Sequence, residues 1–151
     1  MNELIQLNDL FKEVVAEVLP NHSYIFDRWS NAAEKVHTTD LPVVMNIIPK
    51  RQQYTLNTQQ TKIGTTTSCL VAFFDLCPSL DADGEEMAEV LDRCQDAAQR
   101  FFSALTYRNG IAIVGDVNVE TAEASYSACL AGVVCEFRIK TKDKAICGVI
   151  Q

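Results

Sequence analysis

The order of its periodic segments constrains the fold of this chain more than any other feature of the sequence. Apolar side chains recur at three- and four-residue steps in residues 4–19 and again in residues 85–105, which is typical of amphipathic helices. The sequence between and after these stretches is β-prone, so helices do not alternate with strands. We therefore expect an α+β fold with a mainly antiparallel β-sheet packed with two amphipathic helices, in the order α-β-β-β-β-α-β-β-β.

The expected strands are recognised by runs or alternation of apolar and β-branched residues. They cover residues 24–29, 41–48, 65–76, 111–119 and 130–140, with Ala145–Ile150 as a further candidate edge strand and a helical turn at Ala32–Val36. Pro49 is expected to end the second strand. The alternation in residues 130–140 predicts a half-buried antiparallel strand, whereas residues 65–76 are apolar on both faces. Both of those faces must be covered, by the domain's own helices or by a neighbouring subunit.

Residues 50–62 are β-prone but polar on both faces. A strand of this kind has a weakly specified register and is either solvated or projects as a ribbon. A length of 151 residues is usual for one domain. We expect a single α+β domain over residues 1–151, with a polar β-ribbon or loop at about 50–64.

The charge balance bears on the partners of the chain. Twenty acidic and 13 basic side chains give a net charge of −7, so sequence-independent DNA binding is not expected. No apolar run approaches the ~20 residues needed to cross a bilayer, so no membrane partner is expected. The first residues lack the segments of a signal peptide, so we expect a reducing compartment and free thiols. The cysteines then serve as small core residues; they are Cys69, Cys77, Cys94, Cys129, Cys135 and Cys147.

The sequence predicts no catalytic, cofactor-binding or metal-binding residue, and hence no enzyme. It contains no C-x-x-C pair, no nucleotide-binding glycine motif and only two histidines, His22 and His37, which stand apart from any recognisable triad. Asp81–Gly84, with two aspartates before a glycine, is the one segment that resembles part of a calcium-binding loop. An EF-hand alignment would put Ser79 and Val90 at ligand positions, so a turn with an acidic N-cap is favoured.

Positive charge gathers near the C-terminus. Arg138, Lys140, Lys142 and Lys144 recur at every second residue, and a strand that continued that far would place all four on one face. Such a strip is either a solvated sheet face or a surface that meets an acidic neighbour or nucleic acid.

An ordered set of segments carries a resemblance to a known family. It consists of the helix Leu4–Leu19, Tyr24–Asp27 followed by Leu41–Val44, the strand Cys69–Leu76 leading into the helix Glu85–Leu105, and the strand Leu130–Lys140. With the length, the acidity and the long polar loop of the chain, this order resembles the tail-terminator or neck (head-tail completion) proteins of tailed bacteriophages.

The resemblance implies a structural virion protein that forms a ring, commonly six-fold, at the junction of capsid, neck and tail tube. Its partners would be copies of itself and neighbouring tail-tube or neck proteins. DNA would pass only as channel cargo, and the protein would be made in the cytoplasm of the bacterial host. A heterologous ring needs two different contact surfaces per subunit, and the ribbon could supply one by strand addition. Within it we expect Arg51, Tyr54 and Leu56 to make subunit contacts.

Two other functions stay open. A small α+β ligand-binding domain or enzyme would place a few polar groups in an apolar pocket. The candidates for those groups are Tyr24, Asp27 and Cys69, and Asp27 with Asp75 is a candidate carboxylate pair. An assembly chaperone or adaptor would differ from the ring protein mainly in stoichiometry. A deep cavity would favour the pocket function, and a contact surface on the ribbon would favour the ring or the adaptor.

Overall fold

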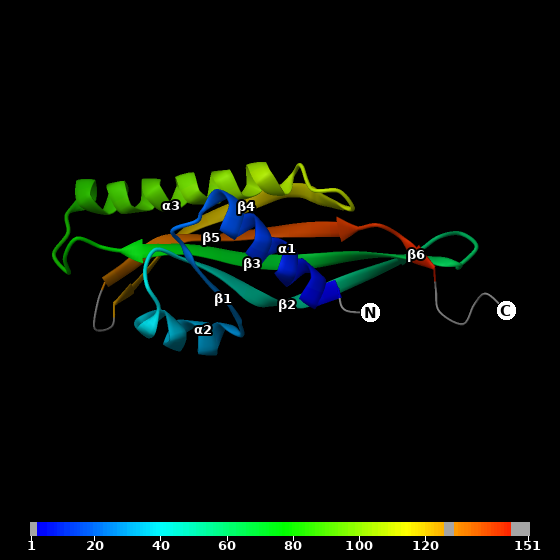
Figure 1. Cartoon of the computed structure of the whole chain (residues 1–151), viewed down its shortest axis with the longest axis horizontal. Helices are drawn as coiled ribbons and strands as arrows, with labels where there is room; N and C mark the ends of the chain where they lie inside the picture. The colour runs from blue at the N-terminus through cyan, green and yellow to red at the C-terminus, as the bar shows by residue number, and fades with distance from the viewer. Residues whose placement is uncertain (1–2, 126–128, 146–151) are drawn as a thin grey trace.

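A twisted sheet forms the centre of the structure, and helices lie against both of its faces (Figure 1). The computed structural model describes residues 3–125 and 129–145. The helices in this part of the chain are α1 (Glu3–Val18), α2 (Trp29–Lys35), the 3-10 turn η1 (Val36–Thr38) and α3 (Gly84–Leu105). The strands are β1 (Ser23–Asp27), β2 (Val43–Leu56), β3 (Lys62–Leu76), β4 (Ile111–Ser125), β5 (Cys129–Thr141) and β6 (Lys144–Ala145). The predicted α+β class is confirmed.

The sheet is mainly antiparallel, as its sequence order favours. Its strands lie in the order β1-β2-β3-β5-β4, and the short β6 pairs with the start of β3. Hairpins join β2 to β3 and β4 to β5 as antiparallel neighbours, and the connection through α3 and β4 brings β5 antiparallel to β3. β1 is parallel to β2, because the chain passes over α2 and η1 before it returns to the sheet.

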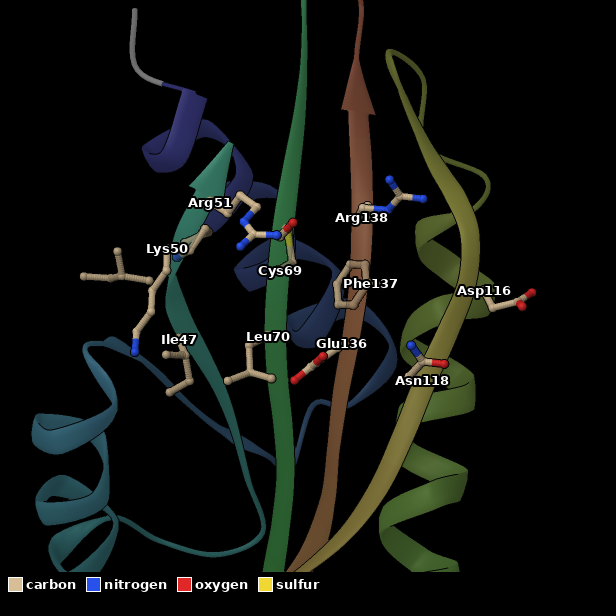
Figure 2. Close-up of a pocket in the computed structure, with 13 residues that line it drawn as sticks. Ile47, Lys50, Arg51, Cys69, Leu70, Asp116, Asn118, Glu136, Phe137 and Arg138 are labelled. Atoms are coloured by element: carbon tan, nitrogen blue, oxygen red, sulfur yellow. The ribbon is translucent and has the colours of Figure 1, made fainter. Parts of the chain in front are cut away.

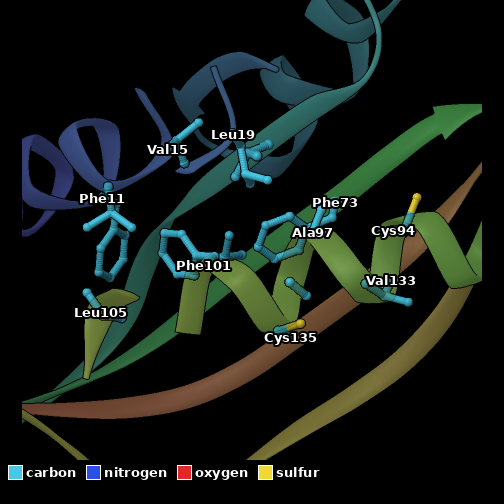
Figure 3. Close-up of a cluster of buried hydrophobic side chains, with 14 of the residues drawn as sticks. Phe11, Val15, Leu19, Phe73, Cys94, Ala97, Phe101, Leu105, Val133 and Cys135 are labelled. Carbon is cyan, nitrogen blue, oxygen red and sulfur yellow. The ribbon is translucent and has the colours of Figure 1, made fainter. Parts of the chain in front are cut away.

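The main core lies between one face of the sheet and the helices α1 and α3. Phe101 of α3 is fully buried at its centre, with its ring centroid 5.4 Å from that of Phe11 and 5.7 Å from that of Phe73 (Figure 3). Both pairs are edge-to-face contacts, which aromatic rings favour beyond the burial of their surface. This face of the sheet, called the helix face below, carries the apolar side of β5 in Val133, Cys135, Phe137 and Ile139.

The opposite face of the sheet is only partly covered. A second apolar cluster joins Ala32 and Val36 to Ile25, Met45 and Ile47 at the end of the sheet that α2 covers. Over the rest of this face the outward side chains of β5 are polar and exposed; they are Glu136, Arg138 and Lys140. We call this uncovered part the open face. The predicted half-buried alternation of residues 130–140 is therefore confirmed.

The first turn of α3 is fixed by a capping box. The Asp83 carboxylate accepts a hydrogen bond from the backbone N–H of Glu86 at 2.9 Å, and the Glu86 carboxylate accepts one from the backbone N–H of Asp83 at 3.4 Å. These bonds satisfy donors that the start of a helix leaves unpaired. The interpretation of Asp81–Gly84 as a turn and acidic N-cap is confirmed.

Several expected boundaries differ from the structure. β2 does not end at Pro49 but runs on to Leu56, with a register shift between Ile47 and Arg51. An irregularity of this kind accommodates a residue that has no backbone N–H, so the described residues hold three strands before α3 and not four. β4 is one strand that continues through residues 120–125, and Gly115 takes a positive φ of 74° at its bulge. The turn expected at Ala32–Val36 is the full helix α2 followed by η1.

Candidate functional site

The most distinctive surface feature is a β-ribbon around the turn of residues 50–64. It joins the last part of β2 to the first part of β3, with pairs from Arg51 opposite Ser68 to Leu56 opposite Ile63. Near the turn its β3 strand also pairs with the short β6. Figure 1 shows the ribbon extending past α1 and α3 at one end of the molecule. This hairpin lies in the segment that the sequence marks as polar on both faces.

The tip of the ribbon is organised by one side chain. The Asn57 carboxamide oxygen accepts hydrogen bonds from the backbone N–H groups of Thr61 at 2.8 Å and Lys62 at 2.9 Å. Gln60 takes a positive φ of 56° within the turn. Asparagine is well suited to such turns, because its side chain replaces backbone hydrogen bonds. The ribbon therefore has a turn whose conformation is fixed by hydrogen bonds.

The residues predicted to make subunit contacts lie on two faces of this ribbon. Tyr54 and Leu56 point to the helix face, where they are 63% and 48% exposed. Tyr54 and the half-buried Ile63 line a hollow of about 520 Å³ together with Leu4 and Ile5 of α1. The helix face of the ribbon is thus an exposed apolar patch beside the start of α1.

Arg51 lies on the opposite side of the ribbon, over the open face. Ser68 joins it in register to Arg138 on β5, and all three line a hollow of about 470 Å³ (Figure 2). Arg51 and Arg138 form no ion pair with any residue that the structure describes. The structure therefore does not bring Arg51 together with Tyr54 and Leu56. The ribbon is apolar on the helix face and carries the charge of Arg51 on the opposite face.

The predicted cationic strip is shorter than its sequence spacing indicates. Arg138 and Lys140 share the open face, but β5 ends at Thr141. The Lys142 backbone N–H instead donates to the carbonyl of Gly110 at 3.2 Å, and Lys144 belongs to β6. Arg51 of β2 adds a third positive charge to this face, separated from Arg138 by one strand, since Ser68 of β3 lies between them in register.

Besides the outer edge of β1, two longer strand edges lack a neighbouring strand in the described part of the chain. β1 covers the outer edge of β2 only as far as Ile47, so residues 48–56 have no neighbour on that side. The neighbouring strand β3 is paired on both sides, with β2 on one side and with β5 and β6 on the other. β4 pairs with β5 alone, which leaves its other edge open along its length. Open edges present unpaired backbone N–H and C=O groups to any strand that can reach them.

The side chains proposed for a ligand pocket do not converge. Tyr24 faces α1, where its hydroxyl donates to the Asn8 side-chain oxygen at 2.6 Å, and burial raises its pKa above the ordinary value. Asp27 lies on the other face of the sheet, 2.6 Å from the Lys35 ammonium. The hydrogen bond from Lys35, with two more from the start of α2, lowers the pKa of Asp27 to about 2. Cys69 is buried in the main core.

A small cavity brings together a histidine, a carboxylate and a thiol that sequence spacing did not connect. His22, Asp75 and Cys94 line this space of about 110 Å³, far below the volume of an ordinary ligand pocket. Burial raises the pKa of the Cys94 thiol to about 11, and its Sγ donates to the Ala131 carbonyl at 3.6 Å. A protonated, hydrogen-bonded thiol is a poor nucleophile. Asp75 is held 3.4 Å from Arg93, so the predicted Asp27–Asp75 pair does not form.

The thiols behave as packing residues where the structure describes them. The five described cysteines are free, and only Cys129 is not fully buried. Cys129 donates from its Sγ to that of Cys77 at 2.6 Å. Burial raises the pKa of Cys69, Cys77 and Cys135 to about 12. Cys147 lies outside the described residues.

Neither a metal-binding cluster in the described residues nor a comparison with known proteins adds a further site. No group of three or more histidine, cysteine or acidic side chains in the described residues is arranged to hold a metal ion. Among the described helices, none has the length and apolarity required to span a membrane. No protein-family model matches the chain, and no curated protein matches it at a significant level.

Proposed function

We propose that this chain is a structural subunit that assembles with copies of itself into a ring. The observation that carries the proposal is the ribbon of residues 50–64, which projects from the layered body and bears exposed Tyr54 and Leu56 (Figure 1). Large exposed apolar side chains on a projecting, hydrogen-bonded hairpin are costly unless another surface covers them. A neighbouring copy would bury this patch.

A ring is favoured over a symmetric dimer because the two candidate contact surfaces of the subunit differ from each other. A ring needs two different surfaces on each subunit, one to give and one to receive. The ribbon supplies the first surface, and the open edge of β4 lies on the opposite border of the sheet. By resemblance in the order of elements, the proposed ring is of the tail-terminator or neck type found in tailed bacteriophages. It would sit in the virion at the tail or neck, contact tail-tube or neck proteins, and let DNA pass as cargo.

Exchange of the exposed apolar side chains for serine tests the proposal. The double variant Tyr54→Ser, Leu56→Ser should stay folded, because both side chains are largely exposed, but should lose assembly in light scattering after size exclusion. Tyr107→Ser is the matched control, since Tyr107 is 85% exposed and lies outside the ribbon. Equal assembly of the ribbon variant and the wild type would remove the ribbon from the interface. A wild type that stays monomeric and is stabilised by a small metabolite would replace the ring with a ligand-binding function.

A further inference from the structure

We propose that the subunits join by strand addition between two particular edges. The outer edge of β2 in the ribbon, residues 51–56, pairs with the outer edge of β4, residues 118–123, in the next copy. This inference rests on the proposed ring function and names the two surfaces that build it. Main-chain hydrogen bonds would supply affinity, and the side chains on the two faces would select the register.

Both edges are free to pair. Within the described residues, the neighbour of β2 on its outer side stops at Ile47, so a strand arriving beyond that point meets no obstacle from β1. Residues 118–123 of β4 have β5 on one side and no strand on the other. This part of β4 contains neither proline nor lysine, the residues that most often protect an exposed edge from pairing.

The directions of the strands suit copies related by rotation in a ring. Each neighbouring pair in the series β2, β3, β5 and β4 is antiparallel, so β2 and β4 run in opposite directions. Two copies placed side by side in the same orientation would therefore bring β2 of one against β4 of the other as an antiparallel pair. The helix face of one copy would continue into the helix face of the next, because such a rotation does not turn the sheet over.

The helix face offers matching apolar side chains. Val119 is 48% exposed. On the helix face, it lines a hollow of about 440 Å³ with Val117 and Phe102, between β4 and α3. An antiparallel register with Tyr54 opposite Val119 also sets Leu56 opposite Val117. Directly opposed aromatic and β-branched side chains stabilise a pair of strands. The same contact would cover the exposed patch of the ribbon.

The open face offers opposite charges in the same register. Glu120 lies on this face, in register with Val134 of β5, and would stand diagonally beside Arg51 of the neighbouring copy. Arg51 and Glu120 are both exposed, and neither forms an ion pair within the described residues. Residues 118–123 carry two acidic and no basic side chains. Charge complementarity of this kind fixes the choice of partner and the register.

Exchange of the two charges is the direct test. Arg51→Glu and Glu120→Arg should each raise the protein concentration at half-assembly by ~10-fold or more, since each creates a like-charge contact. An equimolar mixture of the two variants should assemble again, because every ribbon then meets an opposite charge. Asp92→Arg on the exposed side of α3 is the matched control and should assemble as the wild type does. Circular dichroism of each variant would verify that it is folded.

Hydrogen exchange gives a second readout that does not depend on charge. Assembly of the wild type should slow exchange in peptides that cover residues 51–56 and 118–123, because their edge amides gain acceptors. If the wild type forms rings but the charge variants assemble normally and these peptides exchange unchanged, the strand-addition contact is wrong while the ring function stands. A wild type that forms no oligomer overturns both proposals.

Discussion

At the scale of single residues, the close packing of β5 against β3 depends on Gly132. Gly132 of β5 lies against the backbone of β3, where a Cβ would overlap the Phe73 carbonyl oxygen and stand 2.8 Å from the Cα of Phe74. Neither group is the end of a flexible side chain, so the strands themselves would have to separate. The position therefore requires glycine for space and not for backbone conformation.

Substitution of this glycine should be severe. Gly132→Ala is expected to lower the free energy of unfolding by roughly 3 kcal/mol or more, the upper range for overpacking a core. Gly84→Ala is the control, because a Cβ at Gly84 meets nothing within 4 Å, and its effect should stay within about 1 kcal/mol. Urea unfolding of both variants measures the difference. Similar stabilities would show that β3 and β5 are not as closely apposed as described.

The buried thiols give a prediction about reactivity. Burial raises the pKa of Cys69, Cys77 and Cys135 to about 12 and that of Cys94 to about 11, so thiolate is scarce at pH 8 in the folded protein. The reactive species is the thiolate, and unfolding restores its ordinary abundance. Titration with a chromogenic disulfide should find at most two fast thiols in the native protein and six in denaturant. Six fast thiols in the native protein would contradict this burial.

The same shifts have a defined sign for stability. A thiol with a raised folded pKa keeps its proton when the unfolded chain has lost it. Its contribution to stability is therefore present below the ordinary thiol pKa of about 9 and is lost as pH rises towards about 12. The unfolding midpoint in urea should accordingly fall as the pH rises from about 9 towards about 12, and substitution of Cys135 by alanine should reduce the pH dependence of that midpoint.

At the scale of elements, α3 is the helix whose start is most clearly specified. Asp83 and Glu86 form its capping box, and replacement of Asp83 by alanine should cost about 1 kcal/mol of stability. Asp83→Asn should keep most of that stability, because the carboxamide oxygen can still accept the hydrogen bond from Glu86. Thermal unfolding of the two variants measures the cap. An equal loss in both would assign the effect to charge and not to the cap.

Sequence patterns located the elements with strong periodicity and misjudged those whose form depends on tertiary contacts. The apolar stripes predicted α1 and α3, and the alternation in β5 predicted which of its side chains are buried, since both patterns follow directly from helical and strand geometry. Pro49 misled the prediction for β2, because a local rule for proline does not reveal a register shift stabilised by β3. α2 and η1 were only partly anticipated, since this short polar segment is held by the packing of Ala32 of α2 and Val36 of η1 on β1 and β2.

In the candidate site, too, local sequence patterns predicted some features, while others depend on tertiary contacts. Residues 50–62 were predicted to form a ribbon from their polarity on both faces, and Arg51, Tyr54 and Leu56 were chosen from it. The bulge after Ile47 decides which face of the sheet each of these side chains occupies, and it leaves no local mark in the sequence beyond Pro49. The open edge of β4 was also beyond reach, because strand order is a property of the whole sheet.

At the scale of the whole molecule, the ribbon part of β2 and the length of β4 each lack a neighbouring strand on one side in the described residues, and an exposed apolar patch lies on the ribbon. Sheets of this kind are liable to uncontrolled pairing unless the edges find a defined partner. A closed ring through the ribbon and β4 would pair both of these edges in every subunit, which an isologous dimer through one edge would not achieve. The opposite charges on the two edges favour this head-to-tail arrangement over pairing of like edges.

Ring assembly is tested by the mass of the wild-type protein in solution as a function of its concentration. Light scattering after size exclusion, with negative-stain images of the same fractions, should show a mass that rises to a fixed multiple of the monomer and particles with a central hole. A mass equal to a single chain at every concentration, with no rings in the images, would contradict the assembly of this chain into a ring.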